Sequence, residues 1–307
     1  ATYGTRIQFV VQDAFNNIHP VPVKVSVSCA PGDSSCFTSF AALKTAWTDF
    51  MAGFMQSVID KNPTIDYFDI FSEPNWTWQD LSDQDIFTLF KIAHDTIRSY
   101  RPNAKIVAPS TGDFNKEGLQ KFLTFVADNK LRLDGLSWHE FETPEVVEAH
   151  VKEMRSFFAA KPSLCASVCP EIHINEYTPP QHHLMPGWAL GWLYYLENAN
   201  VDWVSRACWD DVTWSNCWAG FEGLLLEDNV TTRPLYWVHK LYMDLFSGKR
   251  IVTETSDPHI VTLASRDDAK KELQLMVGRY SCGKLNRWCM GAATQVDDLK
   301  TPPRDIM

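Results

Sequence analysis

Short apolar segments alternate with longer amphipathic segments along most of the chain, and this alternation restricts the fold more than any other feature. The apolar segments have the length and composition of buried strands, and those between them place apolar residues at helical spacing. We expect strands at 20–29, 65–71, 104–110, 133–141, 170–177 and 201–209, and helices at 5–18, 41–62, 83–101, 118–130, 144–160, 187–199 and 233–248. Such alternation is typical of an α/β protein with a parallel sheet.

The loops after the expected strands separate two parallel α/β architectures. No glycine-rich phosphate-binding turn follows any of these strands, which disfavours a dinucleotide-binding fold. A (β/α)8 TIM barrel fits better, because polar and aromatic residues stand at the strand ends. Only about six of the eight barrel strands are expected, and the chain opens within a helix. We therefore expect the first two β/α units to come from a second polypeptide or from a longer form of the chain.

The sequence pattern changes near residue 249. Segments 250–256, 259–266 and 271–281 have the alternation of antiparallel strands. We therefore expect a barrel domain at 1–248, incomplete at its N-terminus. A small β-sandwich appendage is expected at 249–307, and its pattern also stops early.

The overall charge excludes several classes of partner. The net charge of −10 argues against binding to nucleic acid or to an anionic membrane surface. The chain has 12 tryptophans, which are typical of flat apolar surfaces for sugar rings and equally of an ordinary core. We expect neither a signal peptide nor an apolar span of membrane length within this sequence. We expect a mature secreted, extracellular or lumenal protein.

The eight cysteines fall into four close couples. We expect disulfide bonds within them, because an even number of closely spaced cysteines is typical of an oxidising compartment. A zinc site is disfavoured, since no couple has the CxxC spacing and no pair of histidines lies beside one. The couples are Cys29 and Cys36, Cys165 and Cys169, Cys208 and Cys217, and Cys282 and Cys289. Asn229 lies in a polar glycosylation sequon, which agrees with secretion.

Two glutamates end expected strands and suggest a catalytic pair. Glu73 follows strand 65–71, and Glu176 lies at the end of strand 170–177. Glycoside cleavage needs two carboxyl groups that flank one bond, and a barrel gathers the C-terminal ends of its strands at one face. The alternative is that each is only a solvated or helix-capping carboxylate. The occurrence of both at strand ends favours the catalytic interpretation.

The segment Ser72-Glu73-Pro74-Asn75 resembles the Asn-Glu-Pro motif of the clan A retaining glycoside hydrolases. Segment 134–139 resembles the end of strand 6 in glycoside hydrolase family 39 and its heparanase-like relatives. The resemblance implies a retaining hydrolase that cleaves O-glycosidic bonds of a polysaccharide or glycan by double displacement. Glu73 would be the acid/base at the end of strand 4, and Glu176 the nucleophile at the end of strand 7. We expect no cofactor and no metal.

The chain departs from the clan motif at one position. Ser72 stands where the clan has an asparagine that contacts the sugar 2-hydroxyl, and a serine side chain is shorter. The departure leaves open a rival interpretation, a catalytically inactive barrel that acts as a carbohydrate-binding or structural/storage glycoprotein.

Several further side chains are candidates for contact with the carbohydrate. Trp138 and Trp209 are candidate sugar platforms or core residues, and His139 is a candidate ligand or a structural histidine. The expected substrate-binding residues are Ser72, Asn75, Trp76, Trp138, His139, Tyr177, Trp209 and Asp210.

Overall fold

The computed structural model describes residues 6–12, 25–26, 29, 36–78, 80–165, 168–179, 182, 185–207, 223–226, 228, 230–246, 248–257 and 259–280. Six strands form one sheet in chain order. They are β1 (Gln8–Gln12), β2 (Tyr67–Phe71), β3 (Lys105–Thr111), β4 (Gly135–Glu140), β5 (Glu171–Tyr177) and β6 (Trp203–Arg206). The pairs β1–β2, β2–β3 and β3–β4 are parallel. The α/β alternation is thus confirmed, and the sequential order is that of part of a (β/α)8 barrel.

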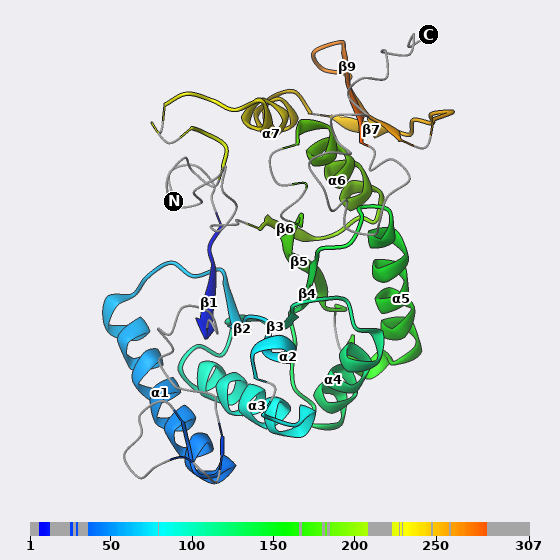
Figure 1. Cartoon of the computed structure of the whole chain (residues 1–307). Helices are drawn as coiled ribbons and strands as arrows, with labels where there is room; N and C mark the ends of the chain where they lie inside the picture. Colours follow the sequence, from blue (N-terminus) through cyan, green and yellow to red (C-terminus); the bar gives the residue numbers. More distant parts are fainter. Residues whose placement is uncertain are drawn as a thin grey trace. The chain divides into compact units, whose positions relative to one another are not determined.

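Helices connect successive strands, as the periodicity predicts. They are α1 (Phe40–Lys61), α2 (Pro74–Thr77), α3 (Asp83–Tyr100), α4 (Lys116–Asp128), α5 (Val146–Ala160), η1 (Pro162–Leu164), α6 (Pro186–Asn198) and α7 (Pro234–Leu245). Figure 1 shows α1, α3 and α4 following one another beside strands β1 to β3. In the described segments, no helix combines the length and the apolar character needed to cross a membrane.

The expected helix at 5–18 is wrong where the structure describes it, because residues Gln8–Gln12 form strand β1. This strand pairs in parallel with β2, with Phe9 opposite Phe68. Its apolar run satisfies helical spacing and a buried parallel strand equally well, and pairing with β2 decides between them. The expected strand at 20–29 falls mainly outside the described residues. Of its described residues, Val25 forms an isolated parallel bridge with Phe37.

The chain divides into two compact units. The first contains Ala1–His139, His150–Asn175 and Asp202–Val204, and the second contains Glu140–Ala149, Glu176–Val201 and Ser205–Met307. Aromatic packing forms the core of the first unit. The ring of Trp47 in α1 packs on Phe71 of β2, and its Nε1 donates a hydrogen bond to the carbonyl of Leu89 in α3 at 2.9 Å. Phe68 of β2 and Phe54 of α1 also pack together, with their rings nearly perpendicular. These contacts fix β2, which carries Glu73 at its end.

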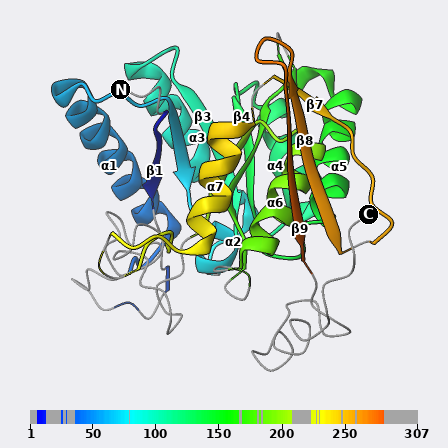
Figure 2. The same cartoon turned by 90° about the horizontal axis from the view of Figure 1, so that it is seen from above.

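The second unit contains a three-stranded antiparallel sheet of β7 (Lys249–Ile251), β8 (Ile260–Asp267) and β9 (Glu272–Arg279). Three antiparallel strands were expected here, although β7 is shorter than segment 250–256 predicts. Helix α6 packs against β8 and β9 (Figure 2) through a cluster that includes Trp188, Leu263 and Tyr280. The second sheet of the expected sandwich is not among the described residues, and the domain boundary after residue 248 stays a prediction.

Two of the four expected cysteine couples are joined. Disulfide bonds connect Cys29 with Cys36 and Cys165 with Cys169. The other four cysteines, Cys208, Cys217, Cys282 and Cys289, lie outside the described residues, as does Asn229.

Candidate active site

The backbone holds Glu73 in one position at the end of β2. Its φ of 50° lies in the left-handed region, so the strand ends abruptly, and Pro74 begins the one-turn helix α2. The Glu73 N–H donates to the carbonyl of Ser110 at 2.8 Å, and the hydroxyl of Thr77 donates to the Glu73 carbonyl at 2.8 Å. The residue is only 4% exposed. The chain therefore tolerates an unfavourable backbone conformation to present a buried carboxylate.

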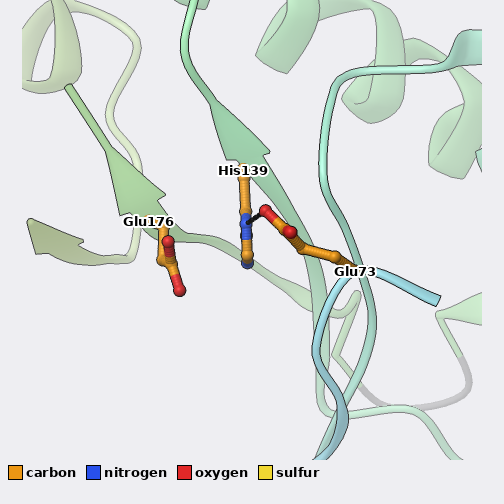
Figure 3. Close-up of side chains that lie close together, drawn as sticks. All are labelled: Glu73, His139 and Glu176. Atoms are coloured by element: carbon orange, nitrogen blue, oxygen red, sulfur yellow. Dashed lines mark hydrogen bonds and ion pairs between the residues drawn. The ribbon is translucent and has the colours of Figure 1, made fainter. Parts of the chain in front are cut away.

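His139 in β4 holds the Glu73 carboxylate. Its Nδ1 and Glu73 Oε1 share a hydrogen bond of 2.7 Å, and both side chains are buried (Figure 3). When Nδ1 carries the proton it donates to Oε1, which leaves Oε2 able to carry a proton for other chemistry. Such a short contact between an imidazole and a carboxylate fixes the orientation of both groups.

Glu176 in β5 joins this pair. One ligand-type atom from each of Glu73, His139 and Glu176 lies within 4.8 Å of the others, and the three side chains come from the ends of β2, β4 and β5 (Figure 3). The sequence predicted that both glutamates would lie at the C-terminal ends of strands, three β/α units apart, where a barrel gathers them at one face. The same atoms suit two kinds of chemistry: proton transfer with nucleophilic attack, and ligation of a divalent cation.

A buried polar network lies further down the same strands of the first unit. Asp69 in β2 accepts hydrogen bonds from Gln8 Nε2 at 2.8 Å, Asn175 Nδ2 at 2.6 Å and Ser110 Oγ at 2.5 Å. The Ser110 hydroxyl is also 2.8 Å from that of Ser137. Barrel interiors are more commonly filled by branched apolar side chains. Asp69 thereby connects β2 with β1, β3 and β5. Its partner Ser110 accepts the hydrogen bond from the Glu73 N–H, and its partner Asn175 directly precedes Glu176.

Burial changes the protonation of Asp69. Desolvation of the buried carboxylate raises its pKa from 3.8 to about 6. The hydrogen bonds from Ser110, Gln8 and Asn175 partly oppose this rise. Sequence reasoning missed Asp69, Ser110 and Ser137. The signal for Asp69 was present: a carboxylate interrupts an otherwise apolar strand four residues before Glu73. The serines carry no comparable signal, since small polar residues are common near strand ends.

The other expected substrate-binding residues occupy different environments. Asn75 clamps a loop: its Nδ2 donates to Asp113 Oδ1 at 2.8 Å, and its Oδ1 accepts from the Gly112 N–H at 2.8 Å. Trp76 is 42% exposed, whereas Ser72 is buried. Asn75 therefore has a structural task whether or not it touches a ligand.

Two of the expected aromatic contacts are with the protein itself. Trp138 is fully buried against Phe114, which favours its interpretation as a core residue. The Tyr177 ring packs near Trp192 of α6, and burial raises the pKa of its hydroxyl to about 12. The expected substrate-binding residues Trp209 and Asp210 lie outside the described residues. Carbohydrate contact stays a prediction for all of these side chains.

The likeness of the chain to known proteins lies in its structure. No protein-family model matches it, and a search of curated proteins found no match. Solved structures do share its fold. A protein described as N2152 from Neocallimastix frontalis is 22% identical with a TM-score of 0.60, over 76% of this chain and 57% of that one.

Two further neighbours are glycosidases by description. The family 39 enzyme from Xanthomonas axonopodis pv. citri is 20% identical (TM-score 0.54, covering 73% of this chain and 49% of that one). A monomeric β-xylosidase from Caulobacter crescentus CB15 is 17% identical (TM-score 0.54, 73% and 50%). The chain spans about half the length of these neighbours. At these identities the likeness concerns the fold, which is the fold expected from the resemblance to family 39.

Proposed function

We propose that this chain belongs to a glycoside hydrolase that cleaves O-glycosidic bonds of a polysaccharide or glycan with retention. The observation that carries the proposal is the group of Glu73, His139 and Glu176 at the strand ends. The fold likeness to described glycosidases supports it. This reaction uses two carboxyl groups, one as acid/base and one as nucleophile. An imidazole that orients only one of them is consistent with such different roles.

In the proposed reaction, Glu176 attacks the anomeric carbon while Glu73 donates its proton to the departing oxygen. The C–O bond to the leaving group breaks as the bond to the Glu176 carboxylate forms. Glu73, now ionised, then takes a proton from a water molecule that attacks the same carbon and releases Glu176. His139 acts as a positioning residue that holds one oxygen of Glu73, so the other oxygen carries the proton.

The separation of the carboxylates supports retention. An oxygen of Glu73 and one of Glu176 lie within 4.8 Å of each other. This suits the retaining spacing of about 5–5.5 Å better than the inverting spacing of about 6.5–9.5 Å, which leaves room for a water molecule.

We further propose secretion into an oxidising compartment, supported by the disulfides Cys29–Cys36 and Cys165–Cys169.

Hydrolysis of a panel of aryl glycosides tests the function. With the sugar that reacts, Glu176→Ala should reduce turnover to background. Glu73→Ala should lower kcat/KM by about 10²- to 10⁴-fold for poor leaving groups, the contribution typical of general acid catalysis. For activated leaving groups, which need no proton, the fall in kcat/KM should be smaller. Azide should then restore turnover of Glu73→Ala and yield a glycosyl azide of retained configuration.

A matched control is Glu117→Ala, which removes an exposed carboxylate that pairs with Lys121. This variant should behave as the wild type. Equal activity in Glu176→Ala and wild type would reject the proposed catalytic pair. Carbohydrate binding without turnover of any glycoside would instead favour the inactive, carbohydrate-binding barrel.

A further inference from the structure

Trp76 has the features of a platform for a ligand. It is 42% exposed, which is unusual for the largest apolar side chain, and it lies three residues after Glu73 in α2. Its N–H donates to the Glu73 carbonyl at 3.0 Å, so the two residues share one helical turn. The position of the platform is therefore coupled to the position of the proposed acid.

One face of the indole rests on the loop after β3. A Cβ atom at Gly112 would lie 2.5, 2.6 and 2.9 Å from the ring atoms Cδ2, Cε3 and Cε2 of Trp76. Real Cβ atoms do not approach so closely, so only glycine allows the ring to lie here. The indole thus covers Gly112 with one face, and a substantial part of the ring stays open to solvent.

The Asn75 amide fixes the same loop. Its two hydrogen bonds, to the Gly112 N–H and to the Asp113 carboxylate, join α2 to the loop that supports the ring. Because this loop supports the Trp76 ring, the Trp76 side chain loses little conformational freedom when it binds a ligand. Exposed aromatic rings held in advance are efficient binding surfaces, because apolar C–H groups of a ligand displace water from the ring face.

We propose that Trp76 forms the subsite for the leaving-group sugar, so that the substrate is an oligosaccharide or polysaccharide and not a glycoside of a small alcohol. This inference rests on the proposed function. The general acid protonates the leaving-group oxygen, and Trp76 shares one helical turn with the proposed acid, which favours contact with the leaving group over contact with the sugar attacked by Glu176. A pyranose presents an apolar C–H face that matches an indole, and the bond cleaved lies between this sugar and the one attacked by Glu176.

The test compares two substrates with the same reacting sugar. One is the glycosyl fluoride, whose leaving group is too small to reach a subsite, and the other is an oligosaccharide of that sugar. For each variant, kcat/KM for the oligosaccharide is divided by kcat/KM for the fluoride. This ratio cancels losses that come from partial unfolding or from general damage to the site.

Trp76→Ala should lower the ratio roughly tenfold, the factor that corresponds to a lost aromatic contact. Trp76→Phe should keep part of it. Gly112→Ala should lower the ratio as well, although Trp76 is still present, because the new Cβ displaces the ring. The control is Trp237→Ala, which removes a similarly exposed indole (49%) from α7 and should leave the ratio unchanged.

An unchanged ratio in Trp76→Ala, with wild-type activity on both substrates established, would overturn the inference while leaving the proposed function intact. An equal fall in the ratio for Trp237→Ala would also overturn it. If the wild type cleaves neither the fluorides nor the oligosaccharides, the proposed function fails and the inference fails with it.

Discussion

Asp69 is the residue that connects the polar side chains beneath the candidate site. It accepts hydrogen bonds from β1, β3 and β5 through Gln8, Ser110 and Asn175. Through Ser110 it reaches the backbone of Glu73, and Asn175 directly precedes Glu176. We therefore expect Asp69 to act on the reaction indirectly, by fixing the strand ends that carry the two glutamates.

The stability of the protein should depend on pH through Asp69. Because its pKa is raised from 3.8 to about 6 on folding, the folded state holds this proton more tightly than the unfolded state. The contribution is fully present below the unfolded pKa and is lost as the pH rises through the folded pKa. Relative to Asp69→Asn, the wild type should therefore lose about 2 kcal/mol of unfolding free energy between about pH 4 and pH 6.

Urea unfolding of both proteins at about pH 4 and pH 7 measures this difference. The comparison with Asp69→Asn removes the contributions of all other groups that titrate in both proteins. A difference between wild type and variant that is the same at both pH values would show that Asp69 titrates normally.

His139 should matter most when the leaving group needs a proton. Loss of a hydrogen bond to a charged group costs about 1.5–3 kcal/mol, so His139→Ala should lower kcat/KM roughly 10- to 100-fold. The loss should be smaller for activated aryl glycosides. The matched control is His259→Ala, which removes an exposed histidine. Equal losses for good and poor leaving groups would contradict a role in orienting the acid.

The expectation that the candidate site needs no metal ion can also be tested. We expect Glu73, His139 and Glu176 to work without a bound cation, so treatment with a chelator should leave kcat unchanged. Added Zn²⁺ should inhibit, because it competes for the carboxylate and imidazole atoms that the reaction uses. Loss of activity on chelation, restored by one equivalent of metal per chain, would refute this.

At the scale of elements, the sequence predicts most of the fold because buried faces leave periodic patterns. Helix α3 begins where Ser82 and Asp85 form a capping box, a signal that is readable in the sequence. Strand β1 was missed because Phe9, Val10 and Val11 satisfy two periodicities at once. Only pairing with β2, whose residues lie about sixty positions away, separates them, and local reasoning has no access to such contacts.

The cap of α3 gives a prediction for this element. Ser82→Ala removes the side chain that accepts the Asp85 N–H and should lower the unfolding free energy by about 1 kcal/mol, without changing catalysis. Ser99→Ala, near the other end of the same helix, should have a smaller effect. Chemical denaturation compares the two variants. Equal destabilisation by both would show that the capping box contributes nothing particular.

The candidate site likewise has features that the sequence predicts and features that it does not. Glu73 and Glu176 are predictable because strand ends in a parallel sheet meet at one edge. The hydrogen bond between His139 and Glu73 is not predictable, because it depends on side-chain orientation across the intervening strand β3. The support of Trp76 by Gly112 is equally hidden, since a lone glycine after a strand is usually only a turn.

At the scale of the whole molecule, the net charge of −10 favours neutral substrates. An anionic glycan should be repelled at long range, and salt should weaken this repulsion. The rate on a neutral oligosaccharide should therefore change little with ionic strength, whereas the rate on a uronic-acid glycan should rise. A fall in the rate on the anionic glycan with added salt would indicate local positive charge that outweighs the net charge.

The most direct test of the central claim is to trap the glycosyl-enzyme. A 2-deoxy-2-fluoroglycosyl fluoride of the reacting sugar slows breakdown of the intermediate, and peptide mapping by mass spectrometry locates the label. We predict one label per chain, on Glu176, and none in Glu176→Gln. A label on Glu73 or on another carboxylate, or turnover without any covalent intermediate, would contradict the two-glutamate mechanism.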